Sequence, residues 1–116
     1  MDYKYIKTDY LEMVAGGDLN LVKELVDMFR DQVAEIHAEM RDLLKKGDYQ
    51  ALGLLAHKAK SSVAIMGMEE LANMLRRFEL QARVGDHSGQ YKEYVEKFGN
   101  DTAAAITELD SFVANK

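Results

Sequence analysis

The chain has 116 residues, of which 47% are hydrophobic and 30% are charged, with a formal net charge of −5; this balance predicts one soluble domain over residues 1–116 with a single core. The absence of cysteine excludes disulfides, thiol catalysis and cysteine-ligated metals. Lys and Arg are spread along the chain and form no one-sided basic run, which argues against a nucleic-acid partner. No secretory leader or run of about 20 apolar residues occurs, so we expect no membrane partner and a cytoplasmic location.

Proline is absent, and the many Ala, Leu, Met, Glu and Lys residues favour long helices. Glycines divide the chain into five segments, and an aspartate follows three of these glycines closely, at Asp18, Asp48 and Asp86. Because glycine is common just after a helix and aspartate is common at the N-cap of the next, each pair predicts a boundary between helices.

Five helices are expected from apolar residues spaced at steps of three and four. The first is short and begins near Thr8, and the second is long and begins near Leu19. The third covers about residues 48–66, the fourth begins near Met68, and the fifth covers about residues 88–114 with a weak point at "GND". Short connections make successive helices antiparallel, so the expected fold is all-α, an up-and-down antiparallel four-helix bundle with a short additional N-terminal helix. Its expected core includes Leu25, Phe29, Ile36, Leu55, Ala59, Leu75, Phe78 and Phe98.

One histidine stands among small residues in the third expected helix, in the stretch "LLAHKAKSSVAIMG". At 100° per residue, His57 lies about 140° from Leu52, which is at the centre of the apolar side of that helix. Its neighbours one turn away are Gly53 and Ser61, which have little or no side chain. We therefore expect His57 to face solvent, with an imidazole that another macromolecule can reach and with Lys60 at its flank.

"AHKAKSSVAIMG" followed by "LANMLRRFELQARVGD" resembles the signature of the histidine-containing phosphotransfer (HPt) domain family. The resemblance rests on a histidine, a lysine three residues later, small residues, a glycine ten residues after the histidine, and a leucine and a Phe-Glu pair on the next helix: His57, Lys60, Ser61, Ser62, Gly67, Leu71, Phe78 and Glu79. The stretch "GGDLNLVKELVDMF" also resembles the second helix of the family, so nearly the whole chain is covered. The chain departs from the family at Ser61, where glycine is usual, and at Phe78, where leucine is commoner.

The resemblance implies that His57 accepts a phosphoryl group from a receiver-domain aspartate of a two-component system and passes it to another. Mg²⁺ and the catalytic machinery would belong to the receiver, so we expect a phosphocarrier with no cofactor of its own, and not an enzyme. Lys60 would offset the charge of the phosphoryl group, and Gly67 would end the helix. The expected receiver-docking surface consists of Gly53, Leu54, Ser61, Ala64 and Ile65. For Leu54 and Ile65, packing against a neighbouring helix is an equal alternative.

Other interpretations stay open at this point. A degenerate bundle of the same kind could bind a receiver or another partner without phosphotransfer, although the presence of both His57 and Lys60 favours a carrier. His37 and His87 lie 20 and 30 residues from His57 and form no H-x-x-x-H or E-x-x-H pair, so no metal site is expected. We expect a monomer that is free-standing rather than part of a larger kinase. The partner kinase and regulator, the signal and the direction of phosphoryl flow are left open.

Overall fold

The structure is a computed structural model that describes residues 3–115, apart from the side chains of residues 14 and 15. Within that range the regular structure is entirely helical, which confirms the expected all-α class. The elements are α1 (Asp9–Ala15), α2 (Leu19–Lys46), α3 (Tyr49–Ile65), α4 (Glu69–Val84), the 3₁₀ turn η1 (Ser88–Gln90) and α5 (Tyr91–Ala114). None of these helices is long and apolar enough to cross a membrane.

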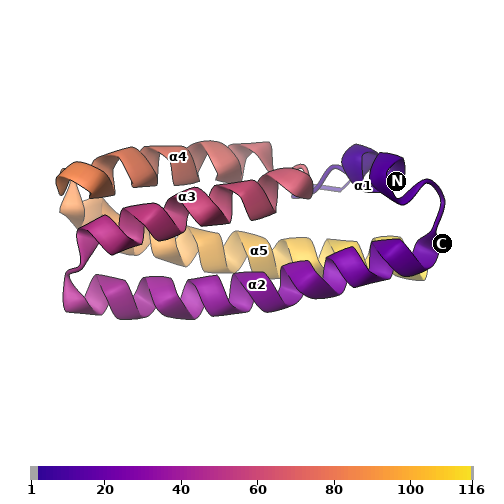
Figure 1. The fold of residues 1–116 in the computed structure, drawn as a ribbon, viewed down its shortest axis with the longest axis horizontal. Coiled ribbons are helices and arrows are strands. Elements are labelled where there is room, and N and C mark those ends of the chain that lie inside the picture. Colours follow the sequence, from indigo (N-terminus) through magenta and orange to yellow (C-terminus); the bar gives the residue numbers. More distant parts are fainter. Residues whose placement is uncertain (1–2, 116) are drawn as a thin grey trace.

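The four long helices lie side by side, and consecutive ones run in opposite directions (Figure 1). The most extensive packing joins α3 to α4 and α2 to α5, while α2–α3 and α4–α5 contacts connect the two pairs. The molecule is therefore an elongated body of 44 × 20 × 20 Å with two layers, one of α3 and α4 and the other of α2 and α5. The short helix α1 lies at the end where the chain also finishes (Figure 1).

The core runs along the length of the bundle and contains seven of the eight residues expected there: Phe29, Ile36, Leu55, Ala59, Leu75, Phe78 and Phe98. Leu25 differs from the expectation, because it is only half-buried at the edge of the core. Val22, Val26 and Phe29 take the inward positions in that part of α2, so the neighbouring Leu25 is turned partly outward.

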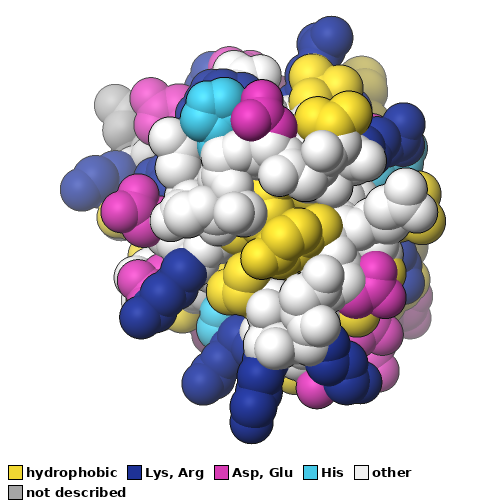
Figure 2. All heavy atoms as spheres, turned by 90° about the vertical axis from the view of Figure 1, so that its left-hand side faces the viewer, with side chains coloured by type: hydrophobic (Ala, Val, Ile, Leu, Met, Phe, Trp, Pro, Cys, Tyr) yellow, Lys and Arg dark blue, Asp and Glu magenta, His cyan; other side chains and the backbone are white. Residues whose placement is uncertain are grey.

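Aromatic rings fill the core near the end of the bundle where α4 leads into α5. The Phe78 ring centroid lies 5.4 Å from that of Tyr91 and 5.1 Å from that of Tyr94, and Tyr49 meets Tyr91 edge-on at 5.0 Å. Such contacts add to the stabilisation that burial of the rings gives. Figure 2 looks at this end and shows hydrophobic side chains at its centre, with charged side chains around them.

Two of the three expected aspartate caps are present. The carboxylate of Asp18 accepts hydrogen bonds from the backbone N–H groups of Asn20 and Leu21 at the start of α2. The carboxylate of Asp48 accepts from the N–H of Ala51 at the start of α3. Each bond satisfies backbone donors that a helix terminus leaves unpaired.

The third cap, Asp86, was wrongly predicted. Its carboxylate accepts from the N–H of the adjacent His87, and α5 begins only at Tyr91, after η1. The Tyr91 hydroxyl has the carbonyl oxygens of both Asp86 and Gln81 within hydrogen-bond distance. A buried side chain therefore fixes this connection, and the start of α5 was expected about three residues too early.

The segment before α1 is attached to α5 and to the end of α3. The carboxylate of Glu108 in α5 accepts from the backbone N–H groups of Lys4, Tyr5 and Ile6, at 2.9, 2.8 and 3.2 Å. The N–H of Lys7 donates to the Met66 carbonyl just after α3. Gly67 follows with a φ of 72°, and a Cβ there would lie within 2.7 Å of Lys7 atoms. Gly67 therefore both suits the left-handed turn after α3 and leaves room for the N-terminal segment.

Candidate functional site

His57 lies on the outer face of α3, with 55% of its side chain exposed. Ser61 and Ala64 are also exposed on this helix. Leu54 is 61% exposed and Ile65 is 40% exposed, so neither is buried against a neighbouring helix. The open environment expected for His57 is therefore present, and the exposed apolar residues Leu54 and Ile65 lie on either side of it along α3.

A buried carboxylate from α4 holds the imidazole of His57. The Nδ1 atom of His57 lies 3.0 Å from Oε1 of Glu79, whose side chain is only 8% exposed. The other oxygen, Oε2, lies 2.9 Å from Nη2 of Arg83, one turn farther along α4. An ionised carboxylate only accepts hydrogen bonds, so His57 carries a proton on Nδ1. In the neutral ring, Nε2 then keeps its lone pair.

Gly53 is buried and does not belong to the open surface, so the expectation that placed it in the docking surface is wrong. A Cβ at Gly53 would lie 3.2 Å from the carbonyl oxygen of Glu79 and 3.3 Å from the backbone nitrogen and Cγ of Arg83. The missing side chain lets α3 and α4 approach closely. This approach brings Glu79 within hydrogen-bond distance of His57.

Lys60 is half-buried on α3, one turn after His57. Among residues 3–115 no carboxylate lies within ion-pair distance of its ammonium group, so its charge is available to a ligand. Ser61 is exposed, whereas Ser62 turns toward α2 and donates to the side-chain oxygen of Gln32 at 3.1 Å. Of the two serines, Ser61 is the more open to a partner.

The sequence singles out Glu79 only as part of the family resemblance, and it predicts no role for Glu79 or for the other α4 residues near the histidine. Glu79 and Arg83 form the hydrogen-bonded group with His57, and Leu80 and Val84 are exposed on the same helix. One signal was present in the sequence, because Glu79 lies four residues after Leu75 and three before Ala82, on the buried stripe of α4. A carboxylate on such a stripe needs a partner.

The other two histidines lie apart from this site. His37 is half-buried on α2, and a Cβ on Gly99 of α5 would lie 2.5 Å from its Nε2 atom. His87 is exposed between α4 and α5, with its Nδ1 atom 3.2 Å from the carboxylate of Asp86. No group of three or more His, Asp or Glu residues that could hold a metal ion occurs in the described part of the chain.

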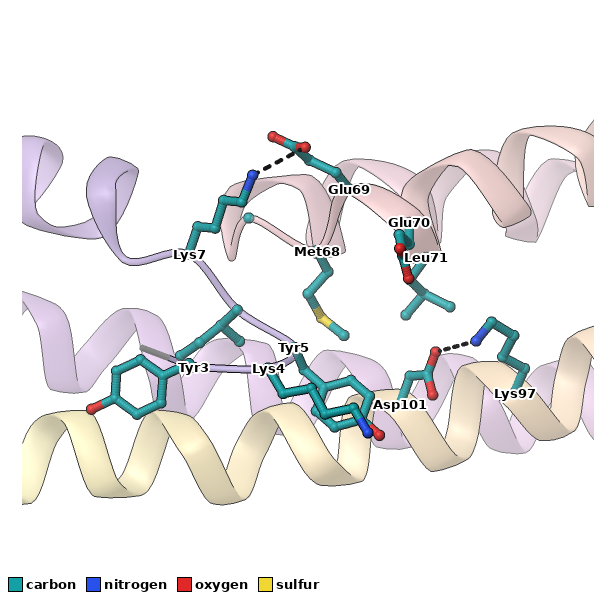
Figure 3. A pocket seen from close by; sticks show the side chains of 12 residues that line it. Tyr3, Lys4, Tyr5, Lys7, Met68, Glu69, Glu70, Leu71, Lys97 and Asp101 are labelled. Carbon is teal, nitrogen blue, oxygen red and sulfur yellow. Dashed lines mark hydrogen bonds and ion pairs between the residues drawn. The ribbon is translucent and has the colours of Figure 1, made fainter. Parts of the chain in front are cut away.

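A cavity of about 590 Å³ lies between the N-terminal segment, the start of α4 and α5 (Figure 3). Two ion pairs border it, Lys7 with Glu69 at 3.2 Å and Lys97 with Asp101 at 2.9 Å. Its rim begins at Gly67, about 15 Å along the helix from His57 at 1.5 Å per residue. The cavity is therefore separate from the histidine.

A helical bundle that presents an accessible imidazole, oriented by a buried carboxylate and flanked by a lysine, has the geometry of a protein that carries a group on a histidine. The model of the Hpt domain family matches residues 24–112, which is most of the chain and includes the whole of this site. The chain belongs to the Hpt domain family. Searches among curated proteins and among solved structures found no match. Membership of the family implies a part in phosphotransfer in two-component signalling, in which Hpt domains interact with receiver domains.

Proposed function

We propose that this chain is a phosphocarrier, in which His57 accepts a phosphoryl group from one receiver aspartate and delivers it to another. The observation that carries the proposal is the hydrogen bond between Nδ1 of His57 and Glu79. It places the proton on Nδ1 and leaves the lone pair on Nε2, the ring nitrogen farther from the backbone. An exposed imidazole nitrogen with a free lone pair can act as a nucleophile.

In the transfer step, Nε2 attacks the phosphorus of the aspartyl phosphate in line with the bond that breaks. A nitrogen–phosphorus bond forms, and the aspartate carboxylate leaves with the electron pair of the broken phosphorus–oxygen bond. The ring of His57 then bears a proton on Nδ1 and the phosphoryl group on Nε2, so it becomes positively charged. Glu79 stabilises this charge through the hydrogen bond that it already accepts, and reversal of the step returns the neutral ring.

The partner supplies the remaining chemistry in this proposal. Mg²⁺ and the groups that position the reacting aspartate belong to the receiver, and this chain contributes no cofactor and is not an enzyme. Lys60 offsets part of the phosphoryl charge, with the modest energy expected of a partly exposed cation. The receiver docks on the exposed residues of α3 and α4 beside His57: Leu54, Ser61, Ala64, Ile65, Leu80 and Val84. We expect a monomer in the cytoplasm.

The test is transfer of a radiolabelled phosphoryl group from phosphorylated receiver domains in the presence of Mg²⁺. The parent should gain a label that is stable to base and labile to acid, as a phosphohistidine is, and unlike a phosphoserine at Ser61 or Ser62. His57→Gln should fold and remain unlabelled, because the Gln amide can still donate to the buried carboxylate of Glu79 but cannot accept a phosphoryl group. His87→Gln changes another exposed histidine and should be labelled like the parent.

Two outcomes would contradict the carrier. A label that persists in His57→Gln would place the acceptor elsewhere. A parent chain that binds receivers but gains no label would be a binding module, which is the alternative function.

A further inference from the structure

Charge is unevenly distributed between the two layers of the bundle. Helices α3 and α4 carry five Lys or Arg residues and three Glu residues, whereas the rest of the chain carries ten basic and seventeen acidic residues. The 17 residues of α3 include two lysines and no Asp or Glu. The layer that presents His57 is thus net positive, in a protein with a net charge of −5.

The positive charge lies next to the histidine. On α4, Arg76, Glu79 and Arg83 occur at positions i, i+3 and i+7, which places them on one face of the helix. Glu79 on this face contacts His57, Arg83 pairs with the same carboxylate, and Arg76 lies one turn before Glu79. Lys60 contributes a third cation from α3. We call Lys60, Arg76 and Arg83 the basic stripe.

Little negative charge compensates this stripe. On this face of α4, Glu79 is paired with Arg83 and His57, and Glu69, two turns before Arg76, is paired with Lys7. Within residues 3–115, neither Lys60 nor Arg76 has a carboxylate within ion-pair distance, and Arg76 is exposed. Unpaired surface cations attract an acidic partner and repel a basic one, and they change association rates more than final affinities.

We propose that the basic stripe selects and steers receiver domains whose contact face is acidic. The proposal rests on the proposed function, because it concerns the partner of the same histidine. Like-charge repulsion disfavours receivers with a basic face, which gives the carrier a means to choose among receivers that share one fold. The stripe thereby acts before the chemical step, during encounter.

The test measures association of the unphosphorylated receiver that binds most tightly, taken from the organism that encodes the chain. Between about 0.1 M and about 1 M salt, the screening length falls from about 10 Å to about 3 Å. The association rate constant of the parent should fall about tenfold or more over this range. Arg76→Gln should lower the rate constant severalfold at low salt and weaken its salt dependence.

Arg41→Gln is the matched control. Arg41 is exposed on α2, in the other layer, and like Arg76 it has no ion pair within the described residues. This variant changes the net charge by the same amount and should associate like the parent. An association rate that does not depend on salt would overturn the proposal. An equal effect of Arg41→Gln and Arg76→Gln would also overturn it, because net charge would then explain the rates.

Labelling of His57, measured separately, distinguishes this proposal from the proposed function. If His57 is labelled while binding is insensitive to salt, steering is wrong and the carrier function stands. If binding depends on salt and on Arg76 but His57 gains no label, steering stands and the carrier function is wrong. If Arg76→Gln slows transfer within the bound complex and leaves association unchanged, the stripe acts on the phosphoryl group, and steering is wrong.

Discussion

His57 is oriented by a carboxylate that comes from a different helix. Burial of Glu79 would be costly for an unpaired charge, but its two oxygens are occupied by His57 and Arg83. The hydrogen bond that Oε1 of Glu79 accepts from Nδ1 also selects the tautomer of the imidazole. In the proposed carrier, Glu79 is therefore a positioning residue that acts through His57.

Glu79→Ala should slow phosphotransfer about tenfold, which corresponds to about 1.4 kcal/mol. It should also lower the free energy of unfolding by about 1–3 kcal/mol, because Arg83 and His57 lose a buried partner. Nitrogen NMR should show the Nδ1–H tautomer of His57 in the parent and a substantial Nε2–H population in the variant.

Glu79→Gln is the conservative control, since its amide oxygen can still accept from Nδ1 but carries no charge. It should keep the tautomer and transfer at an intermediate rate. A parent that holds its proton on Nε2 would contradict this role.

The pairing of α3 with α4 shows where inference from the sequence stops. The exposure of His57 followed from positions within one helix, where 100° per residue fixes the angles between side chains. The partnership with Glu79 joins residues 22 apart in the sequence, so it depends on how two helices pack. The expectation that Gly53 is exposed was wrong for the same reason. Gly53 lies at the margin of the apolar side of α3, where the position of α4 decides whether a residue is covered.

The boundaries of the helices were also predicted correctly where local contacts decide them and wrongly where tertiary packing does. Asp18 and Asp48 cap helices through local hydrogen bonds and were predicted from local sequence. Asp86 was not a cap, because the connection after α4 is held by the buried side chain of Tyr91. Local signals are thus reliable where the deciding bond is local, and they fail where tertiary packing decides.

The weak point expected in the last helix proves to be a packing site between α2 and α5. Helix α5 is continuous through Gly99, and the ring of His37 from α2 occupies the space where a side chain of residue 99 would lie. A glycine inside a helix costs about 1 kcal/mol relative to alanine. At this position the cost is offset by the room that it gives to His37.

A double-mutant cycle tests this packing. Gly99→Ala should destabilise the parent, because the new methyl group would lie 2.5 Å from Nε2 of His37 and displace the ring. In a His37→Ala background the same change should stabilise the protein by about 0.5–1 kcal/mol, since only helix propensity then differs. Urea unfolding of the four proteins gives the coupling energy. Equal effects of Gly99→Ala in both backgrounds would show that the two residues do not interact.

In the whole molecule, His57 and the contacts that attach the N-terminal segment lie in different parts of the bundle. The N-terminal segment, Glu108 and the cavity of Figure 3 lie where α3 ends and α4 begins, whereas His57 lies about 15 Å away along α3. The aromatic cluster around Tyr91 closes the bundle at its other end. Within residues 3–115 the anchored N-terminal segment and the aromatic cluster thus lie toward the two ends of the bundle, and His57 stays exposed on α3, where a partner can reach it.

Ionisation of the buried Tyr91 is expected to lower the stability of the bundle at high pH. Burial raises the pKa of the Tyr91 hydroxyl above its ordinary value, and the nearby Asp86 raises it further. A group whose pKa is raised by folding stabilises the folded state fully below its unfolded pKa, about 10 for tyrosine, and that contribution is lost as the pH rises through the folded pKa. Urea unfolding should therefore show a loss of stability as the pH rises above about 10. Tyr91→Phe should lower stability by about 1 kcal/mol at neutral pH, through the lost hydrogen bond, and should reduce the loss at high pH.

Tyr10→Phe changes an exposed tyrosine and should retain the loss seen in the parent. If Tyr91→Phe and the parent lose the same stability at high pH, Tyr91 is not its source.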